Sequence, residues 1–286
     1  MYADSVPELP EVETITRGLD QRVRGDSIDS VWIGSRKQPL KSPAARIVAA
    51  LEGRKILRVH RAGKHIVFDL QGAGPAAGSR SRQGKQSAGA QWIVHLGMTG
   101  RMVVTGAGDE IVRHTHLVAR LASGRELRFI DPRMFGKLSV HPGSFDPGGI
   151  EPLEIDEDRF AALFRGRKTP IKSALLNQKL LRGVGNIYAD ESLFRAGLRP
   201  RRRAAALTRD DLRRLHGTVQ AVLREAIALG GSSISDYVDA SGEEGFFQLQ
   251  HRVYGREGEP CLVCRTAVKR VVLGGRSSHY CPKCQK

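Results

Sequence analysis

The sequence predicts an α+β fold in three successive parts: a leading helix with a β-sandwich, a helical segment, and a C-terminal hairpin that binds zinc. Short β-rich runs separated by turn residues continue to about residue 130, the pattern becomes helical near residue 151, and all four cysteines lie after residue 260. We expect domains at residues 7–150, 151–245 and 246–286, with residues 1–6 as a separate extension.

The first predicted helix begins near Pro10. Proline suits a first helical turn, where its missing N–H is not needed. Val12, Ile15 and Leu19 then recur at helical spacing and form an apolar stripe. We therefore expect one face of this helix to be buried.

Seven short runs after this helix have the composition of strands. Turn residues separate them at intervals that suit a sandwich or a barrel. Residues 71–91 show no periodicity, so we interpret them as a loop within a hairpin. Arg80, Arg82 and Lys85 in this loop could contact phosphates, although a solvated insertion is the commoner case. The predicted strands are 31–33, 56–60, 65–70, 92–96, 102–104, 116–121 and 127–130.

The middle of the chain has helical patterning. Helices are predicted at residues 156–164, 172–179 and 190–196, the last after a glycine turn. Thr208 and Asp211 have the spacing of a helix-capping pair. They predict a long helix that ends at Gly230-Gly231.

The cysteines form two Cys-x2-Cys pairs with sixteen residues between them. Each pair fits a tight turn that directs two thiolates to one metal, and the spacing is typical of a tetrahedral zinc site. Val268, Val271 and Leu273 alternate between the pairs as in a β-hairpin. Two disulfides are the weaker alternative, because nothing else suggests secretion. We expect one structural Zn²⁺ bound by Cys261, Cys264, Cys281 and Cys284.

The charge balance favours a polyanionic partner. Lys and Arg number 46 against 30 Asp and Glu, which gives a formal net charge of +16. Such an excess most often indicates nucleic acid. Ribosomal and membrane-surface proteins are also basic, but they tend to have lysine-rich tails, whereas these arginines are scattered through predicted elements. No apolar run reaches the length of a membrane span, so the sequence predicts a cytosolic protein.

Pro7 and Glu8 are candidates for covalent catalysis. At a chain start, a proline nitrogen is a secondary amine that can form a cationic iminium with a sugar aldehyde, beside a carboxylic acid. Inside a chain the same nitrogen is a tertiary amide and cannot attack. A GTG codon, which encodes valine internally, can also start translation, so Val6 suggests a mis-annotated start and a chain that begins at Pro7. The structural alternative is a helix start at which Glu8, Glu11 and Glu13 complement the helix dipole.

Six short motifs follow one another from Pro7 to the zinc hairpin. They are Pro7-Glu8-Leu9-Pro10-Glu11, Gly63-Lys64-His65, His95-Leu96-Gly97-Met98, Asp131-Pro132-Arg133-Met134-Phe135-Gly136, Gly185-Asn186-Ile187-Tyr188-Ala189-Asp190-Glu191 and Tyr254-Gly255-Arg256-Glu257. Together they resemble formamidopyrimidine-DNA glycosylase, a bifunctional repair enzyme for oxidised purines. The related endonuclease VIII family has Pro-Glu-Gly-Pro at its start, where this chain has Leu9.

The resemblance implies a fold and a reaction. It implies that residues 151–245 are a helix-two-turn-helix domain and that the protein is a bacterial, cytoplasmic, nucleoid-associated monomer acting on damaged double-stranded DNA. Pro7 would attack the sugar C1′ while Glu8, held partly protonated, donates a proton to the ring oxygen. β- and then δ-elimination would cut the strand without a catalytic metal, so the zinc would be structural only.

The resemblance also assigns residues to the extruded base and its gap. A base cannot be excised while it is stacked, so such an enzyme flips it out and fills the gap. Met98 and Phe135 would fill the gap, and Arg133 would bind the opposite cytosine. Taken alone, Met98 could be a core residue and Asp131 to Arg133 an ordinary turn ion pair. Met134 stands where many members have a second arginine, which leaves the opposite-base preference open.

Five further residues are assigned to DNA by the same resemblance. Lys64 would bind phosphates together with three other residues, and we also count it with Pro7 and Glu8 as catalytic. A further lysine is similar to a residue near the damaged base in that family. Taken alone, a surface lysine is usually solvated and a lone histidine structural. Residues 232–237 correspond to a loop that closes over the purine. The four other residues are His95, Asn186, Arg276 and, near the base, Lys168.

Two alternatives stay open. The first belongs to another class: if residues 1–6 are retained, Pro7 is an amide and the protein would bind damaged DNA without catalysis. The second keeps the enzyme but assigns it to oxidised pyrimidines. The true first residue distinguishes the first alternative, and the lesion preference distinguishes the second.

Overall fold

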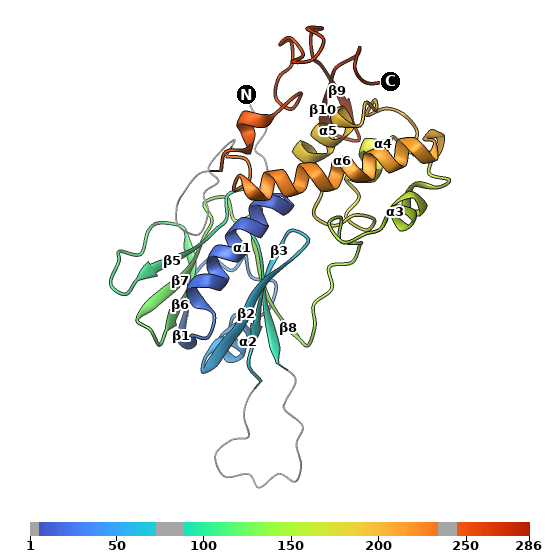
Figure 1. Ribbon diagram of the computed structural model, residues 1–286. Coiled ribbons are helices and arrows are strands. Elements are labelled where there is room, and N and C mark those ends of the chain that lie inside the picture. Colours follow the sequence, from blue (N-terminus) through green and yellow to red (C-terminus); the bar gives the residue numbers. More distant parts are fainter. Residues whose placement is uncertain (1–5, 73–88, 234–244) are drawn as a thin grey trace.

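The structure is a computed structural model that describes residues 6–72, 89–233 and 245–286 (Figure 1). It confirms the predicted α+β organisation. Arg80, Arg82, Lys85 and most of the loop at 232–237 lie outside the described residues. The elements are α1 Leu9–Val23, β1 Ser27–Ile33, α2 Ala44–Leu51, β2 Arg54–Ala62, β3 His65–Leu70, β4 Ala90–His95, β5 Arg101–Gly106, β6 Thr115–Leu121, β7 Arg125–Ile130, β8 Lys137–Pro142, α3 Glu157–Phe164, α4 Ile171–Leu175, α5 Asn186–Arg195, η1 Ala204–Ala206, α6 Arg209–Ala228, η2 Phe247–Gln250, β9 Lys269–Leu273 and β10 Arg276–Tyr280.

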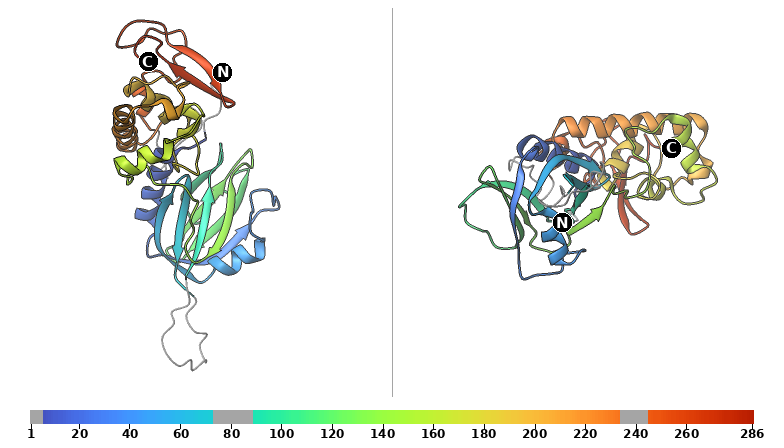
Figure 2. Two further views of the ribbon diagram at one scale, coloured as in Figure 1. Left: turned by 90° about the vertical axis from the view of Figure 1, so that its right-hand side faces the viewer. Right: turned by 90° about the horizontal axis from the view of Figure 1, so that it is seen from below.

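Eight antiparallel strands form one sheet that divides into two halves. The order is β5-β7-β6-β1-β2-β3-β4-β8. β1 and β2 pair only through Ser27 with Lys55 and Ile28 with Arg54, so a short seam joins the halves. Side chains from both halves, α1 and α2 share one hydrophobic core, as the predicted sandwich requires. Figure 2 shows α1, in dark blue, lying along the strands.

The sequence analysis missed two elements of this part. α2 has eight residues and buries only Ile47 and Leu51, which is too short a pattern to show helical periodicity. β8 buries Leu138 and Val140 between polar residues. Both elements are defined mainly by the core that they cover, which local sequence does not reveal.

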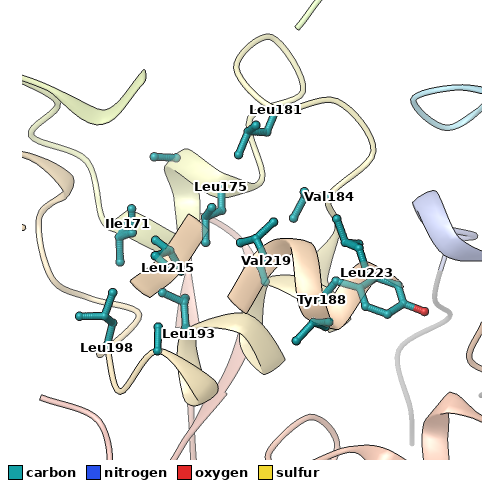
Figure 3. Close-up of a cluster of buried hydrophobic side chains, with 14 of the residues drawn as sticks. Ile171, Leu175, Leu181, Val184, Tyr188, Leu193, Leu198, Leu215, Val219 and Leu223 are labelled. Atoms are coloured by element: carbon teal, nitrogen blue, oxygen red, sulfur yellow. The ribbon is translucent and has the colours of Figure 1, made fainter. Parts of the chain in front are cut away.

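The helices of the second part enclose a separate core. Figure 3 shows Leu215, Val219 and Leu223 of α6 beside Tyr188 and Leu193 of α5 in this cluster. The predicted helices are confirmed with shifted ends, since α4 stops four residues early and α5 begins at residue 186. No helix in the described ranges has both the length and the apolar character needed to cross a membrane.

The predicted cap of α6 is confirmed. The Thr208 hydroxyl accepts a hydrogen bond from the backbone N–H of Asp211 at 3.1 Å, and the Asp211 carboxylate accepts one from the N–H of Thr208 at 3.1 Å. Two N–H groups that the helix leaves without partners are thereby satisfied.

α1 belongs to both cores. Val12, Ile15 and Leu19 lie in the sheet core, as the apolar stripe predicted, whereas Leu9 lies in the helical core. Figure 1 shows α1 extending from the sheet to α6. The start of α1 is therefore inserted into the second part of the molecule.

α5 connects the helical core to the zinc hairpin. Asp190 forms an ion pair with Lys172 of α4 at 2.7 Å and accepts the backbone N–H of His279 in β10 at 2.8 Å. Lys172 also donates to the carbonyl of Ser277 at 2.5 Å. The carboxylate of Glu191 accepts the backbone N–H groups of residues 252–254 at 2.9 to 3.0 Å.

Replacing Asp190 by Asn would leave the Lys172 ammonium buried without its counter-ion. Removing one partner of a buried pair costs about 3–5 kcal/mol, so we expect the free energy of unfolding in urea to fall by about that amount. Asp158→Asn is the matched control, because Asp158 and its partner Arg209 are 81% and 73% exposed and such pairs contribute about 0–1 kcal/mol. Equal losses in the two variants would contradict the role given to Asp190.

Candidate active site and zinc centre

A cavity of about 600 Å³ lies where the start of α1, the turn between β2 and β3, the loop before α5 and the tip of the zinc hairpin meet. Val6 lines it, and Pro7, the next residue, is buried. The fold thus brings together predicted site residues from distant parts of the chain. They are Glu8, Lys64, His95, Asn186 and Arg276.

The N-terminus of α5 holds the Glu8 carboxyl. Its oxygens accept the backbone N–H of Ile187 at 3.2 Å and that of Tyr188 at 3.5 Å. Gly185 leaves the space for it, since a Cβ at residue 185 would lie 2.0 Å from Cδ of Glu8. Gly183, with a φ of +91°, receives Leu9 in the same way, and a Cβ there would lie 2.8 Å from that side chain. The glycine turn before α5 is therefore shaped by the start of α1.

Burial shifts Glu8 and Lys64 towards their neutral forms. The pKa of Glu8 is raised to about 7: burial is the main cause and Glu11 adds to it, while Lys64 and the two amides oppose it. Burial likewise lowers the pKa of Lys64, although Glu8 and Glu11 counteract it. A carboxyl with a pKa near 7 exchanges a proton readily at neutral pH.

Glu11 has a larger role than the sequence analysis gave it. Its buried carboxylate accepts the backbone N–H of Glu8 at 2.9 Å, the Tyr188 hydroxyl, and the backbone N–H of Ser232 at 2.8 Å. Burial raises its pKa as well. Glu11 therefore fixes the backbone of Glu8 against α5. Only its spacing of three residues from Glu8 could have suggested this; its other partners lie far away in sequence.

The turn that carries Lys64 is held by a buried ion-pair network. Arg61 donates to Glu13 at 2.8 Å and to both oxygens of Glu151 at 2.8 and 3.0 Å. Arg182, which also pairs with Glu151 at 3.4 Å, packs against Gly63, where a Cβ would lie 3.2 Å from its own. The network joins α1, β2, the segment after the sheet and the loop before α5, and so sets the position of Lys64 relative to Glu8.

The structure does not bring Lys168 to the cavity. Lys168 is exposed in the segment between α3 and α4 and is not among the residues that line the cavity. Lys172, four residues later, is the buried lysine. Burial lowers its pKa and Arg276 adds to this effect, whereas Asp190 and Glu8 oppose it. The sequence analysis missed Lys172 because a lysine in a predicted helix gives no sign of burial.

His95 ends β4 at the cavity wall, as predicted. Its Nδ1 accepts the backbone N–H of Gly97 at 3.1 Å, which leaves the proton on Nε2. Burial, together with smaller contributions from His65, Lys137 and Lys64, lowers the pKa of His95 to about 4. His95 is therefore a neutral hydrogen-bond donor at pH 7.

The zinc hairpin presents Arg276 at the cavity. Gly274 and Gly275 have φ of 54° and 77°, which is the two-residue turn that a tight hairpin requires. Arg276 follows them and is exposed, and the next residue, Ser277, accepts a hydrogen bond from the Asn186 amide at 3.3 Å. This contact joins the start of α5 to the hairpin tip.

Met98, Arg133 and Phe135 lie on two loops that pack together. A Cβ at Gly97 would lie 2.6 Å from the backbone of Phe135. The guanidinium carbon of Arg133 lies 4.9 Å from the centre of the Phe135 ring, and Phe135 is 47% exposed. Met98 is half-buried between β4 and β5.

Asp131 fixes these two loops. Its buried carboxylate accepts the Thr99 hydroxyl at 2.5 Å, the backbone N–H of Gly136 at 2.7 Å and that of Arg133 at 3.3 Å. The carboxylate oxygens of Asp131 thus accept hydrogen bonds from the loop backbone and from Thr99. The exposed Phe135 and Arg133 are consequently held on a rigid support.

The four cysteines form a site that fits zinc. Their sulfur atoms all lie within 4.8 Å of one another, with 3.9 Å between Cys261 and Cys284 and 3.4 Å between Cys264 and Cys281. Tetrahedral zinc with Zn–S bonds of about 2.3 Å requires sulfur atoms about 3.8 Å apart. Four thiolates at this spacing match one structural Zn²⁺ and no disulfide pairing is present among them.

Comparison with known families covers most of the chain. The formamidopyrimidine-DNA glycosylase N-terminal domain matches residues 6–138, its H2TH domain matches residues 149–238, and the zinc finger found in FPG and IleRS matches residues 258–286. The chain belongs to the formamidopyrimidine-DNA glycosylase family. The predicted family, the expectation of an enzyme and the single structural zinc are confirmed.

Individual relatives agree with the family match. The formamidopyrimidine-DNA glycosylase of Solibacter usitatus is 44% identical, over 98% of this chain and all of its own length. Among solved structures, the MutM (FPG) protein of Thermus thermophilus has 40% identity and a TM-score of 0.82, with 98% of both chains covered. Lactococcus lactis Fpg in complex with an abasic site containing DNA has 30% identity and a TM-score of 0.83, with 98% of this chain and 99% of its own covered.

The raised pKa of Glu8 predicts a pH dependence of stability. The folded protein binds the Glu8 proton more tightly than the unfolded chain, whose pKa is about 4.5, so the free energy of unfolding should fall as the pH rises from about 4.5 to about 7. At about 1.4 kcal/mol per unit, the whole change is about 3 kcal/mol. Urea titrations at pH 5 to 8 should show wild type losing stability relative to Glu8→Gln.

Glu13→Gln is the control for this measurement. Burial raises the pKa of Glu13, but its hydrogen bonds and ion pairs with Arg61 and Arg17 lower it below its usual value overall. The contribution of Glu13 to stability is lost only at lower pH. The difference in free energy of unfolding between Glu13→Gln and wild type should therefore stay constant from pH 5 to 8. A flat difference for Glu8→Gln as well would contradict the raised pKa of Glu8.

Removing one thiolate should disrupt the zinc hairpin. Cys281→Ser should lower the zinc content from one per chain towards zero and weaken binding to a duplex with an abasic-site analogue, because the tip that carries Arg276 loses its metal clamp. Metal analysis and fluorescence anisotropy measure the two effects. Val263→Ser, at a residue 70% exposed between two ligands, should retain the zinc. Unchanged affinity in zinc-free Cys281→Ser would show that binding does not need the hairpin.

Proposed function

We propose that this chain is a bifunctional DNA glycosylase and AP lyase that excises oxidised purines, including 8-oxoguanine and formamidopyrimidines, from duplex DNA in base excision repair. The observation that carries the proposal is the Glu8 carboxyl, whose pKa of about 7 lets it hold a proton next to Pro7 in a cavity that also presents Lys64 and Arg276. Lactococcus lactis Fpg, crystallised with DNA that contains Fapy-dG, supports the assignment of substrate class.

The first half of the proposed reaction removes the base. The Pro7 nitrogen, as a secondary amine, attacks C1′ of the damaged nucleotide. The bond from C1′ to the base breaks, and the base leaves with the electron pair and takes up a proton. Glu8 then gives its proton to O4′ as the C1′–O4′ bond breaks and an iminium forms between C1′ and Pro7.

The second half cuts the strand. The iminium acidifies the C2′–H bond, and loss of that proton with departure of the 3′-phosphate leaves a C2′=C3′ double bond. A second elimination releases the 5′-phosphate, and water hydrolyses the iminium to regenerate the amine. These reaction steps need no oxidant, reductant or metal, so the proposed role of zinc is only to shape the hairpin.

The remaining site residues are proposed to bind DNA. Phe135 and Met98 fill the gap left by the flipped base, and Arg133 hydrogen-bonds the base opposite. The exposure of Phe135 and the rigid support at Asp131 favour this role. At the cavity, the charged and neutral donors that bind phosphates are Lys64, His95, Asn186 and Arg276. The exposed Lys168 is proposed only as a peripheral DNA contact.

This mechanism requires a free Pro7 nitrogen. In the proposed active form the chain therefore begins at Pro7, without residues 1–6. The form that retains residues 1–6 is the competing candidate, because it would keep the DNA-binding groups and lack the nucleophile. Activity on oxidised pyrimidines is the second candidate, since Lactococcus lactis Fpg has also been crystallised with an oxidized pyrimidine containing DNA.

The proposal is tested by the intact mass of protein expressed from its own upstream DNA, before and after borohydride reduction with an 8-oxoguanine duplex. We expect a chain that begins at Pro7 and gains the mass of a DNA remnant, because borohydride reduces the iminium. A chain that retains residues 1–6 and forms no adduct would favour binding without catalysis. An adduct on the extended chain would mean that another amine attacks.

Glu8→Gln is the companion variant in this test. It should still bind the abasic-analogue duplex but excise 8-oxoguanine at least about a hundredfold more slowly, since positioned acids contribute about 10²–10⁴ in rate. Retained excision would remove Glu8 from the acid role. Faster excision of an oxidised pyrimidine than of 8-oxoguanine by the wild type would favour the second candidate.

A further inference from the structure

One face of β3, β4 and β8 carries a row of three basic side chains. His65 is directly opposite His95 across β3 and β4, and His95 is directly opposite Lys137 across β4 and β8. Opposed residues of antiparallel strands project to the same face, and neighbouring strands lie about 4.8 Å apart. The ring centres of His65 and His95 are 5.0 Å apart. This row, which we call the basic row, leads from the cavity wall at His95 out to β8.

Lys137 is the outermost member of the basic row. It is the first residue of β8 and is exposed. Burial lowers the pKa of His65 and His95, and the charge of Lys137 lowers both further. The ring of Phe145 lies 5.1 Å from that of His65 and adds no charge. The row therefore consists of two imidazoles whose pKa values are shifted towards the neutral form and one exposed lysine.

Lys137 lies between the cavity and the loop that carries Arg133 and Phe135. Lys137 directly follows Gly136, whose N–H is bound to Asp131 in the loop that carries Arg133 and Phe135. On its other side, Lys137 is one strand away from His95, which lines the cavity. A DNA strand whose damaged nucleotide enters the cavity while Phe135 fills its place must pass along this edge of the sheet.

We infer that Lys137 binds a phosphate of the lesion-bearing strand, next to those held at the cavity, and so extends the phosphate-binding surface along the basic row. The inference rests on the proposed function, because that function brings the damaged strand to this edge. An exposed ammonium on a rigid strand contacts phosphate as a point charge and releases a condensed counterion when it does so.

The test measures how salt affects DNA binding by the full chain. Affinity for a duplex with an abasic-site analogue is measured by fluorescence anisotropy between 50 and 200 mM NaCl for wild type, Lys137→Ala and Lys137→Arg. Each phosphate contact contributes about 0.9 to the slope of log affinity against log salt, so Lys137→Ala should lose about 0.9 of slope and bind about three- to tenfold more weakly at the lowest salt. Lys137→Arg should retain the slope.

Lys55→Ala is the matched control, because it removes the same charge from an exposed position on β2 at the seam of the sheet. A second measurement places a neutral methylphosphonate at each phosphate beside the lesion in turn. At one of these phosphates, the methylphosphonate should weaken DNA binding by the wild type and leave binding by Lys137→Ala unchanged.

Two results would overturn the inference. One is a salt slope for Lys137→Ala that is as steep as the slope for Lys55→Ala. The other is that every methylphosphonate weakens DNA binding by wild type and by Lys137→Ala to the same extent. Excision of 8-oxoguanine by the wild type is measured in parallel. Its absence together with a reduced Lys137→Ala slope would refute the proposed function and leave the phosphate contact in place, so the two failures are distinguishable.

Discussion

The contact between the Glu8 carboxyl and the N-terminus of α5 is the interaction on which the rest of the structure depends. Free amides at a helix start attract an anion, while burial disfavours its charge. Here the two hydrogen bonds are 3.2 and 3.5 Å long, and burial prevails, so the pKa lies near 7. The amides fix the acid in space without fixing its charge. An acid of this kind can hold a defined position through a proton transfer.

The same helix, α5, ten residues long, also contacts several other segments of the chain around the cavity. The Tyr188 hydroxyl binds Glu11 of α1, Asp190 binds Lys172 and the zinc hairpin, and Glu191 binds the backbone of residues 252–254. These partners come from four separate segments of the chain, and all three carboxylates are buried. Because a buried carboxylate without its donors is costly, each contact forms only when its segment is in place. The cavity is consequently a property of the assembled molecule.

The sequence was most informative where chemistry depends on local spacing. The cysteine pairs, the capping pair at Thr208 and the glycine turn before α5 each act over a few residues, and the structure has all three. The role of Glu11 and the burial of Lys172 were missed, because contacts with distant segments decide both. A glutamate in a first turn looks the same whether it faces water or a tyrosine 177 residues away. Pairwise contact across domains is the information that one sequence does not carry.

Charge in the site is arranged by depth. Inside the cavity, desolvation shifts the pKa values of Glu8, Lys64 and His95 towards their neutral forms, whereas Arg133 and Arg276 are exposed. In the proposed function, a phosphodiester backbone would meet exposed arginines at the rim before it reaches the buried groups within. Its own negative charge would raise the pKa of Glu8 further, because a nearby like charge disfavours the carboxylate. In the proposed mechanism, binding of the polyanion and retention of the Glu8 proton would therefore reinforce each other.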